Sequence, residues 1–88
     1  MKEAELVIKN KLGMHARAAS LFVKTAEKFK CDVAMEKDGI RVNAKSIMGI
    51  LMLAAPLGST VKVSTSGESE EDCLAALSEL VDRKFGEE

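Results

Sequence analysis

The sequence predicts an α+β protein in which three helices cover one face of a four-stranded antiparallel sheet. Several short segments alternate apolar and polar residues with period two, which is typical of strands with one covered face. Two longer segments repeat apolar residues at spacings of three and four, which is typical of amphipathic helices. The expected order of elements is β-α-β-β-α-β-α, and one layer of helices over one sheet is the simplest way to bury these faces.

The first strand and the first helix are indicated by residues 4–29. Apolar residues alternate with charged ones at the start of this segment, at Ala4, Leu6 and Ile8. Further along, apolar residues recur at helical spacing with charged residues between them: Ala19, Phe22, Ala26 and Phe29. The spacing predicts a helix that begins close to His15 and buries a stripe of alanine and phenylalanine.

Residues 31–42 predict the second and third strands. Cys31, Val33 and Met35 alternate with polar residues, and a second short segment covers residues 40–42. The pair Asp38-Gly39 stands between the two segments, and such a pair favours a tight hairpin turn. The two strands are therefore expected to be antiparallel neighbours.

The C-terminal half predicts a short helix, a strand and a last helix. Ser46 precedes the apolar residues 47–53 and can cap their free N–H groups, while Pro56 and Gly58 end this helix of about two turns. Residues 61–64 alternate as a strand that ends at residues 66–67. Ser69 with Asp72 resembles a capping box for the last helix, which Gly86 is expected to end. Its buried stripe is Leu74, Leu77, Leu80 and Val81.

Length and composition favour a single folded domain over residues 1–88 with its functional site on the surface. A chain of 88 residues has little room for an internal chamber, and 47% apolar with 31% charged residues is ordinary for a globular domain. Thirteen basic and fourteen acidic residues leave a net charge of −1, which argues against a nucleic-acid partner or an anionic membrane. Any phosphate site is therefore expected to be local.

The sequence also predicts a cytoplasmic protein without membrane insertion. The N-terminus carries two acids within its first five residues, and Gly49 and Pro56 interrupt the longest apolar run. Cys31 and Cys73 lie far apart and have no second pair, so neither a disulfide framework nor a metal site is expected. We interpret both cysteines as small apolar side chains in a reducing compartment.

His15 and Arg17 are the candidates for chemistry. They fall where a loop containing Gly13 meets the start of the first helix, and N–H groups without partners and the helix dipole favour an anion there. His15 is the only histidine, and its neutral imidazole can act as a nucleophile near pH 7. Arg17 and the backbone N–H groups of Ala16 and Arg17 can then bind phosphate oxygens. Taken alone, a His-x-Arg triplet is more often a polar cap with a solvated arginine.

A second segment favours the phosphate interpretation. Gly-Met-His-Ala-Arg-Ala-Ala at positions 13–19, taken with Lys-Ser-Ile-Met-Gly-Ile-Leu at positions 45–51, resembles the histidine-containing phosphocarrier family of the bacterial phosphoenolpyruvate-dependent sugar phosphotransferase system. The resemblance covers essentially the whole chain, including its length and the Ser-Gly-Glu segment at 66–68. It implies an open-faced β-sandwich, which matches the order of elements derived above.

The resemblance also implies the roles of individual residues. His15 would accept a phosphoryl group on Nδ1 from enzyme I and pass it to a histidine of an enzyme IIA-type protein, with Arg17 and the helix amides supporting the transfer. Ser46 would be the site of regulatory phosphorylation by a kinase/phosphorylase, in addition to its capping role. The first helix and the short helix would form the docking surface, with these candidate residues: Ser20, Ile47, Met48, Leu51 and Met52. A monomer that needs no cofactor and no metal is expected.

The chain departs from the family pattern at two positions. Ala18 stands where a proline is usual after the active-site arginine, which leaves the first helical turn less rigid. Leu12, just before Gly13, cannot offer the hydrogen bond that a polar residue often provides there. These departures leave open a branch devoted to nitrogen-linked or other regulation instead of sugar uptake.

Two other functions compete with phosphoryl relay. One is a regulatory interaction module whose output is the phosphorylation state of Ser46. The other is a small nucleic-acid-binding domain, which lacks support because the sequence has three phenylalanines but no tyrosine, no tryptophan and no basic patch.

Overall fold

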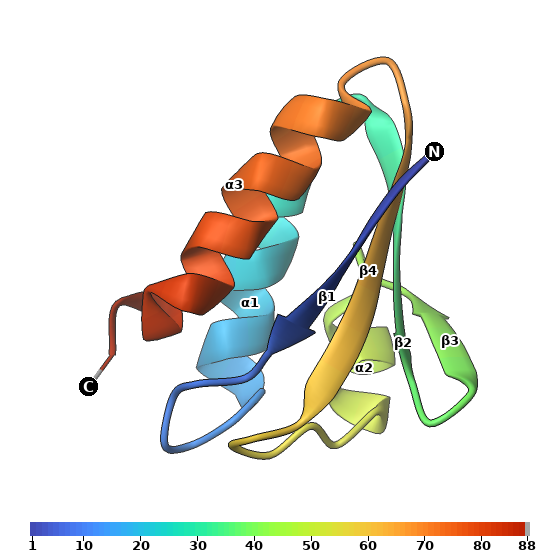
Figure 1. Cartoon of the computed structure of the whole chain (residues 1–88). Helices are drawn as coiled ribbons and strands as arrows, with labels where there is room; N and C mark the ends of the chain where they lie inside the picture. Colours follow the sequence, from blue (N-terminus) through green and yellow to red (C-terminus); the bar gives the residue numbers. More distant parts are fainter. Residues whose placement is uncertain (88) are drawn as a thin grey trace.

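The computed structural model describes residues 1–87, in which one sheet and three α-helices follow the predicted order (Figure 1). The strands are β1 (Lys2–Val7), β2 (Cys31–Lys37), β3 (Ile40–Asn43) and β4 (Thr60–Gly67). The helices are α1 (Ala16–Ala26), α2 (Ile47–Met52) and α3 (Glu70–Asp82), and a 3-10 turn, η1 (Lys84–Gly86), follows α3. The predicted fold class is confirmed.

All strand pairs are antiparallel, and the strand order is β1-β4-β2-β3. Leu6 of β1 lies opposite Val61, and Met35 of β2 lies opposite Val63. Between β2 and β3, Asp38 and Gly39 have φ values of 53° and 82°, as a tight hairpin with two left-handed residues requires. The predicted hairpin is therefore confirmed. The position of β4 between β1 and β2 could not be predicted, because it depends on pairing between residues far apart in the sequence.

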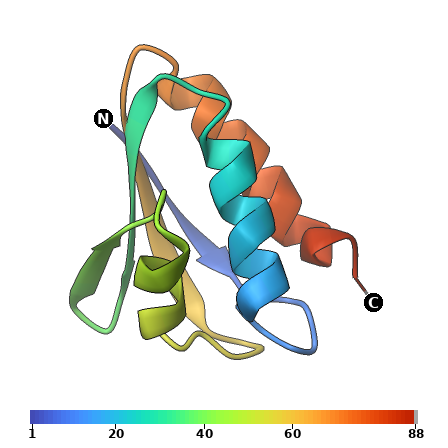
Figure 2. The same ribbon diagram turned by 180° about the vertical axis from the view of Figure 1, so that it is seen from behind.

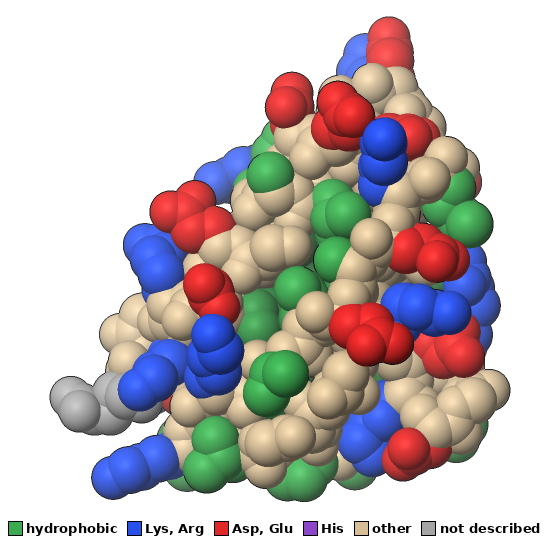
Figure 3. Space-filling model, viewed as in Figure 1, with side chains coloured by type: hydrophobic (Ala, Val, Ile, Leu, Met, Phe, Trp, Pro, Cys, Tyr) green, Lys and Arg blue, Asp and Glu red, His purple; other side chains and the backbone are tan. Residues whose placement is uncertain are grey.

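The core lies between the sheet and the helices. In the two opposite views, α1 and α3 run side by side along one face of the sheet, and α2 lies beside the N-terminal half of α1 (Figures 1 and 2). The largest fully buried side chains include Ile8, Phe22, Met35, Ile50, Leu77 and Val61. Three acidic residues that alternate with residues packed on the core are exposed: Glu3, Glu5 and Asp32. Figure 3 shows charged side chains of both signs on the face of the molecule that it presents.

Three details at the helix ends differ from expectation. Helix α1 ends at Ala26, so Phe29 lies beyond it and is only partly buried. The capping box at Ser69 was wrong, because its side chain makes no capping bond; instead, a carboxylate oxygen of Glu70 accepts from the Gly67 N–H at 3.0 Å. Helix α3 ends at Asp82 and not at Gly86, because Lys84 and Phe85 adopt positive φ values that end the helical path.

Both cysteines are free, with Cys73 buried and Cys31 partly buried. Burial, together with the neighbouring Cys31 thiol, raises the pKa of Cys73 to about 12. Its thiolate is therefore scarce at neutral pH, which agrees with a packing role. Among the described residues, no helix has the length and apolar character needed to cross a bilayer.

Candidate functional site

The loop before α1 is held against the segment that follows α2. Gly13 has a φ of 70°, and a Cβ at this position would lie 2.7 Å from the carbonyl oxygen of Ala55 and 2.8 Å from the Cα of Pro56. The next residue, Met14, donates its N–H to that Ala55 oxygen at 2.8 Å. Only glycine fits both the left-handed conformation and the close approach. The backbone of the loop just before His15 is therefore fixed in position at the start of α1.

His15 is the N-cap residue of α1, as the sequence predicted. Its backbone is extended, and its Nδ1 accepts a hydrogen bond from the backbone N–H of Arg17 at 3.2 Å. A ring nitrogen that accepts carries a lone pair, so the proton of the neutral imidazole lies on Nε2. The nucleophilic electron pair thus lies on Nδ1, beside the first turn of the helix.

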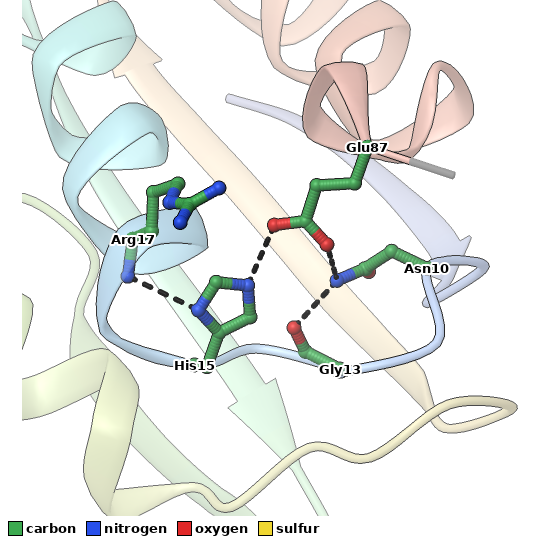
Figure 4. Close-up of polar contacts among 5 residues, drawn as sticks. All are labelled: Asn10, Gly13, His15, Arg17 and Glu87. Carbon is green, nitrogen blue, oxygen red and sulfur yellow. Dashed lines mark hydrogen bonds and ion pairs between the residues drawn. The ribbon is translucent and has the colours of Figure 1, made fainter.

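The other ring nitrogen contacts a residue that the sequence analysis missed. Nε2 of His15 lies 2.6 Å from Oε2 of Glu87 (Figure 4), and the two side chains are 26% and 14% exposed. The hydrogen bond from His15 is the main reason that the pKa of Glu87 lies below its ordinary value, and the charge of Arg17 lowers it further. The imidazole is therefore held at both nitrogens.

A buried amide positions Glu87. The side chain of Asn10 is fully buried, and its Nδ2 donates to the Gly13 carbonyl at 2.7 Å and to Oε1 of Glu87 at 3.1 Å (Figure 4). Nothing in the sequence pattern linked these residues to His15, since Glu87 lies 72 positions away and Asn10 is one polar residue after a strand. Only the folded chain brings them together.

The donors expected to bind phosphate are in the first turn of α1, and the Arg17 N–H is the one that contacts Nδ1. Ala16 is the first residue of α1, so its N–H has no partner within the helix, and none is formed with the other described residues. The Arg17 side chain is exposed and turns toward the side of the imidazole where Glu87 lies (Figure 4). Within residues 1–87 its guanidinium makes no hydrogen bond or ion pair, so it remains available to an anion.

Ser46 and the candidate docking residues lie on and beside α2. The Ser46 hydroxyl accepts from the Gly49 N–H at 3.1 Å, which confirms the predicted cap. Met48 and Met52 are 70% and 75% exposed, whereas Leu51 and Ser20 are only partly exposed. Ile47 is 39% exposed, and Ile50 is the buried residue of this helix.

Two exposed leucines extend this apolar surface toward the His15 loop. Leu12 precedes Gly13, and Leu57 follows the Pro56 that contacts Gly13. Both side chains are more than half exposed. They were not among the predicted docking residues, although exposed apolar residues next to a reactive group commonly mark a partner site. We call Leu12, Ile47, Met48, Met52 and Leu57 the apolar face.

Comparison with known proteins gives a consistent result. Residues 2–83 match the family whose description is "PTS HPr component phosphorylation site". The chain is 46% identical over 88 residues to the phosphocarrier protein HPr of Xylella fastidiosa strain 9a5c, covering 100% of this chain and 99% of that protein.

Solved structures agree with this match. The crystal structure of HPr-C-His from Thermoanaerobacter tengcongensis superimposes with a TM-score of 0.96 at 53% identity, over 100% of this chain and 99% of that one. Crh, the catabolite repression containing protein of Bacillus subtilis, aligns with a TM-score of 0.77 at 42% identity, over 96% and 97% of the chains, and forms a dimer with a swapped domain.

Proposed function

The chain belongs to the HPr phosphocarrier family of the phosphotransferase system, and on that premise we propose that it carries a phosphoryl group on Nδ1 of His15. It accepts the group from phosphorylated enzyme I and passes it to a histidine of an enzyme IIA-type protein. The observation that carries this proposal is the geometry of His15, a partly exposed imidazole whose Nδ1 lone pair accepts the Arg17 N–H at the N-terminus of α1.

The transfer needs little from the carrier beyond position and electrostatics. The Nδ1 lone pair attacks phosphorus, the new N–P bond forms, and the P–N bond of the donor breaks with its electron pair returning to the donor's nitrogen. No proton leaves His15. Once Nδ1 is bonded to phosphorus it no longer accepts a hydrogen bond, so the Arg17 N–H becomes free to bind a phosphoryl oxygen.

Further donors then stabilise the phosphoryl group. The Ala16 N–H at the start of α1 and the guanidinium of Arg17 are the further donors that we propose for the phosphoryl oxygens, and the positive end of the α1 dipole favours the added negative charge. The site stays open at the surface, because the phosphoryl group must leave again for the acceptor protein. The reverse reaction into an acceptor uses the same contacts in the opposite order.

The apolar face is the proposed docking surface for both partners. Its residues lie on α2 and in the two segments that meet at Gly13, so a partner that covers it also excludes water from the reacting atoms. Ser20 and Leu51 lie at its edge, on α1 and α2. We place this exchange in the cytoplasm, where two free thiols stay reduced.

Phosphorylation of Ser46 by a kinase/phosphorylase is the proposed regulation. A phosphate on this hydroxyl adds roughly −1.5 to −2 charges at the start of α2. The N-terminus of a helix tolerates that charge, whereas an acidic partner surface would be repelled from the adjacent apolar face. Docking would therefore weaken without loss of the fold.

A second candidate function is a regulatory module that acts through Ser46 alone. The similarity to Crh, a catabolite repression containing protein, favours keeping this alternative. The two functions are separated by partner pull-downs with Ser46→Asp and His15→Ala variants. A regulator that does not relay responds to the first change and ignores the second.

The proposal is tested by incubating the chain with enzyme I and phosphoenolpyruvate and then adding an enzyme IIA-type acceptor. We expect one acid-labile phosphate on the chain and its transfer to the acceptor, and no phosphate on a His15→Ala variant. A variant lacking the imidazole that still takes up label would overturn the proposal.

A further inference from the structure

The C-terminal segment forms a hook that returns Glu87 to the His15 ring. After α3 the three residues Lys84, Phe85 and Gly86 have φ values of 58°, 56° and 76°, a left-handed path that is costly for a bulky side chain. Phe85 is nevertheless buried, at 4% exposure, and the Glu87 N–H donates to the Lys84 carbonyl at 2.9 Å. The packing of Phe85 thus stabilises a strained turn. Because of this turn, the side chain of Glu87 points toward His15.

The position of Glu87 is fixed from its other side as well. Asn10 uses both of its N–H bonds, one to the Gly13 carbonyl of the His15 loop and one to Oε1 of Glu87. A flipped amide would place its oxygen against two acceptors, so the contacts themselves fix its orientation. The same buried amide therefore ties the loop and the C-terminal hook together.

The ring is supported by Glu87 and not by the adjacent loop residue Leu12. Leu12 is 71% exposed and has no polar group with which to hold the ring. The imidazole is held instead through Nε2, by a carboxylate that is itself only 14% exposed. Hydrogen bonds to an ionised partner are about twice as strong as neutral ones, and limited exposure reduces their screening by water.

We propose that Glu87 is a positioning residue that stabilises the phosphorylated form of His15 through charge compensation. This inference rests on the proposed function. When Nδ1 forms its bond to phosphorus, the ring keeps its Nε2 proton and gains a positive charge, while the phosphoryl group carries the negative charge. Glu87 accepts the Nε2–H bond before and after the transfer, and its negative charge favours the ring's charged state.

The consequence is thermodynamic as well as geometric. A carboxylate that stabilises the phosphorylated ring lowers the tendency of the carrier to give its phosphoryl group away. Glu87 thereby sets the phosphoryl-transfer potential of this chain relative to its donor and its acceptor. A residue that only orients the ring changes rates in both directions but leaves this equilibrium unchanged.

A competition experiment separates these roles. Wild-type chain is mixed in equal amounts with an isotope-labelled Glu87→Ala chain, or in a second reaction with an isotope-labelled Glu87→Gln chain. Each mixture receives catalytic enzyme I and limiting phosphoenolpyruvate, and mass spectrometry measures how the phosphate is divided at equilibrium. We expect the wild type to hold about tenfold more phosphate than Glu87→Ala, with Glu87→Gln in between because its amide oxygen still accepts the Nε2–H bond. Glu68→Gln, an exposed change in the turn before α3, is the matched control and should divide the phosphate equally with the wild type.

The outcomes distinguish this inference from the proposed function. Equal division between the wild type and Glu87→Ala would overturn the role of Glu87 while His15 still carried phosphate. If neither chain takes up phosphate on His15, the relay itself fails. As an independent readout, the Nε2-bound proton of the unphosphorylated wild type should give a downfield, exchange-protected NMR resonance that Glu87→Ala lacks, and its absence from the wild type would contradict the contact.

Discussion

At the scale of single residues, the account depends on how the two nitrogens of one imidazole are engaged. The Arg17 N–H donates a hydrogen bond to Nδ1, which therefore carries the lone pair. The Glu87 carboxylate accepts a hydrogen bond from the Nε2 proton. His15 and Arg17 could be proposed from the sequence because they are close together at a helix start and because the segment at 45–51 favoured the phosphate interpretation over a polar cap. Asn10 and Glu87 could not, because their relation to His15 exists only after α3 packs on the sheet and η1 turns the chain back.

Arg17→Ala should slow phosphorylation of His15 by roughly a hundredfold, because it removes a positively charged donor from the developing charge while leaving the backbone N–H in place. Rapid-quench measurements with phosphorylated enzyme I check this, with Arg17→Lys expected to retain part of the rate. Lys28→Ala removes an exposed positive charge beyond the end of α1 and serves as control. Equal rates for Arg17→Ala and the control would contradict the role of the guanidinium.

At the scale of elements, local rules predicted most of what is observed. The Asp38-Gly39 turn and the Ser46 cap follow from side-chain and backbone chemistry within a few residues, and both appear as expected. The observed ends of α1 and α3 differ from the predicted ends. The path of the chain after Ala26 and the burial of Phe85 both depend on tertiary packing, which local rules do not describe. The start of α3 is supported by Glu70 and not by a capping box, since the Glu70 carboxylate reaches the Gly67 N–H.

Ser46→Ala should lower the free energy of unfolding by about 1 kcal/mol, because the Gly49 N–H loses its acceptor at the start of α2. Urea denaturation measures the loss. Ser46→Asp keeps an oxygen acceptor at the cap and should remain close to the wild type in stability, even where it weakens docking. A Ser46→Ala chain as stable as the wild type would show that this cap contributes little.

At the scale of the whole molecule, the sheet order brings Glu87, after α3, to the His15 loop before α1. The strand β4 lies between β1 and β2, and α3 packs beside α1, so the residues after α3 can reach the start of α1 (Figure 2). The sequence predicted the order of elements, but the site needs this spatial order. The carboxylates that tie the chain ends, Glu70 and Glu87, also link stability to pH.

The free energy of unfolding should fall as the pH decreases from about 5 to about 3. The pKa of Glu70 is lowered mainly by the Gly67 N–H, and the pKa of Glu87 mainly by His15. A carboxyl group whose pKa is lower in the folded state stabilises the fold above its unfolded pKa, and this contribution is lost as the pH falls through the folded value. Thermal denaturation across this range should show a smaller decrease for a Glu70→Gln/Glu87→Gln variant, and an unchanged slope would contradict these linkages.

The chain should be a monomer in dilute solution. Strand β1 pairs with β4 of the same chain over six residues, and Ile8, just after it, is fully buried. These contacts of β1 and Ile8 are therefore already made within one chain. Size-exclusion chromatography with light scattering checks the mass, and a stable species of twice the chain mass would instead indicate a dimer of the kind formed by Crh.

The most direct test of the whole account is nuclear magnetic resonance of the phosphorylated chain with labelled histidine nitrogens. We expect one phosphorus resonance coupled to Nδ1 of His15, with the Nε2 proton retained. Phosphorus coupled to Nε2, or attached to any residue other than His15, would contradict the claim that this imidazole presents Nδ1 for phosphoryl transfer.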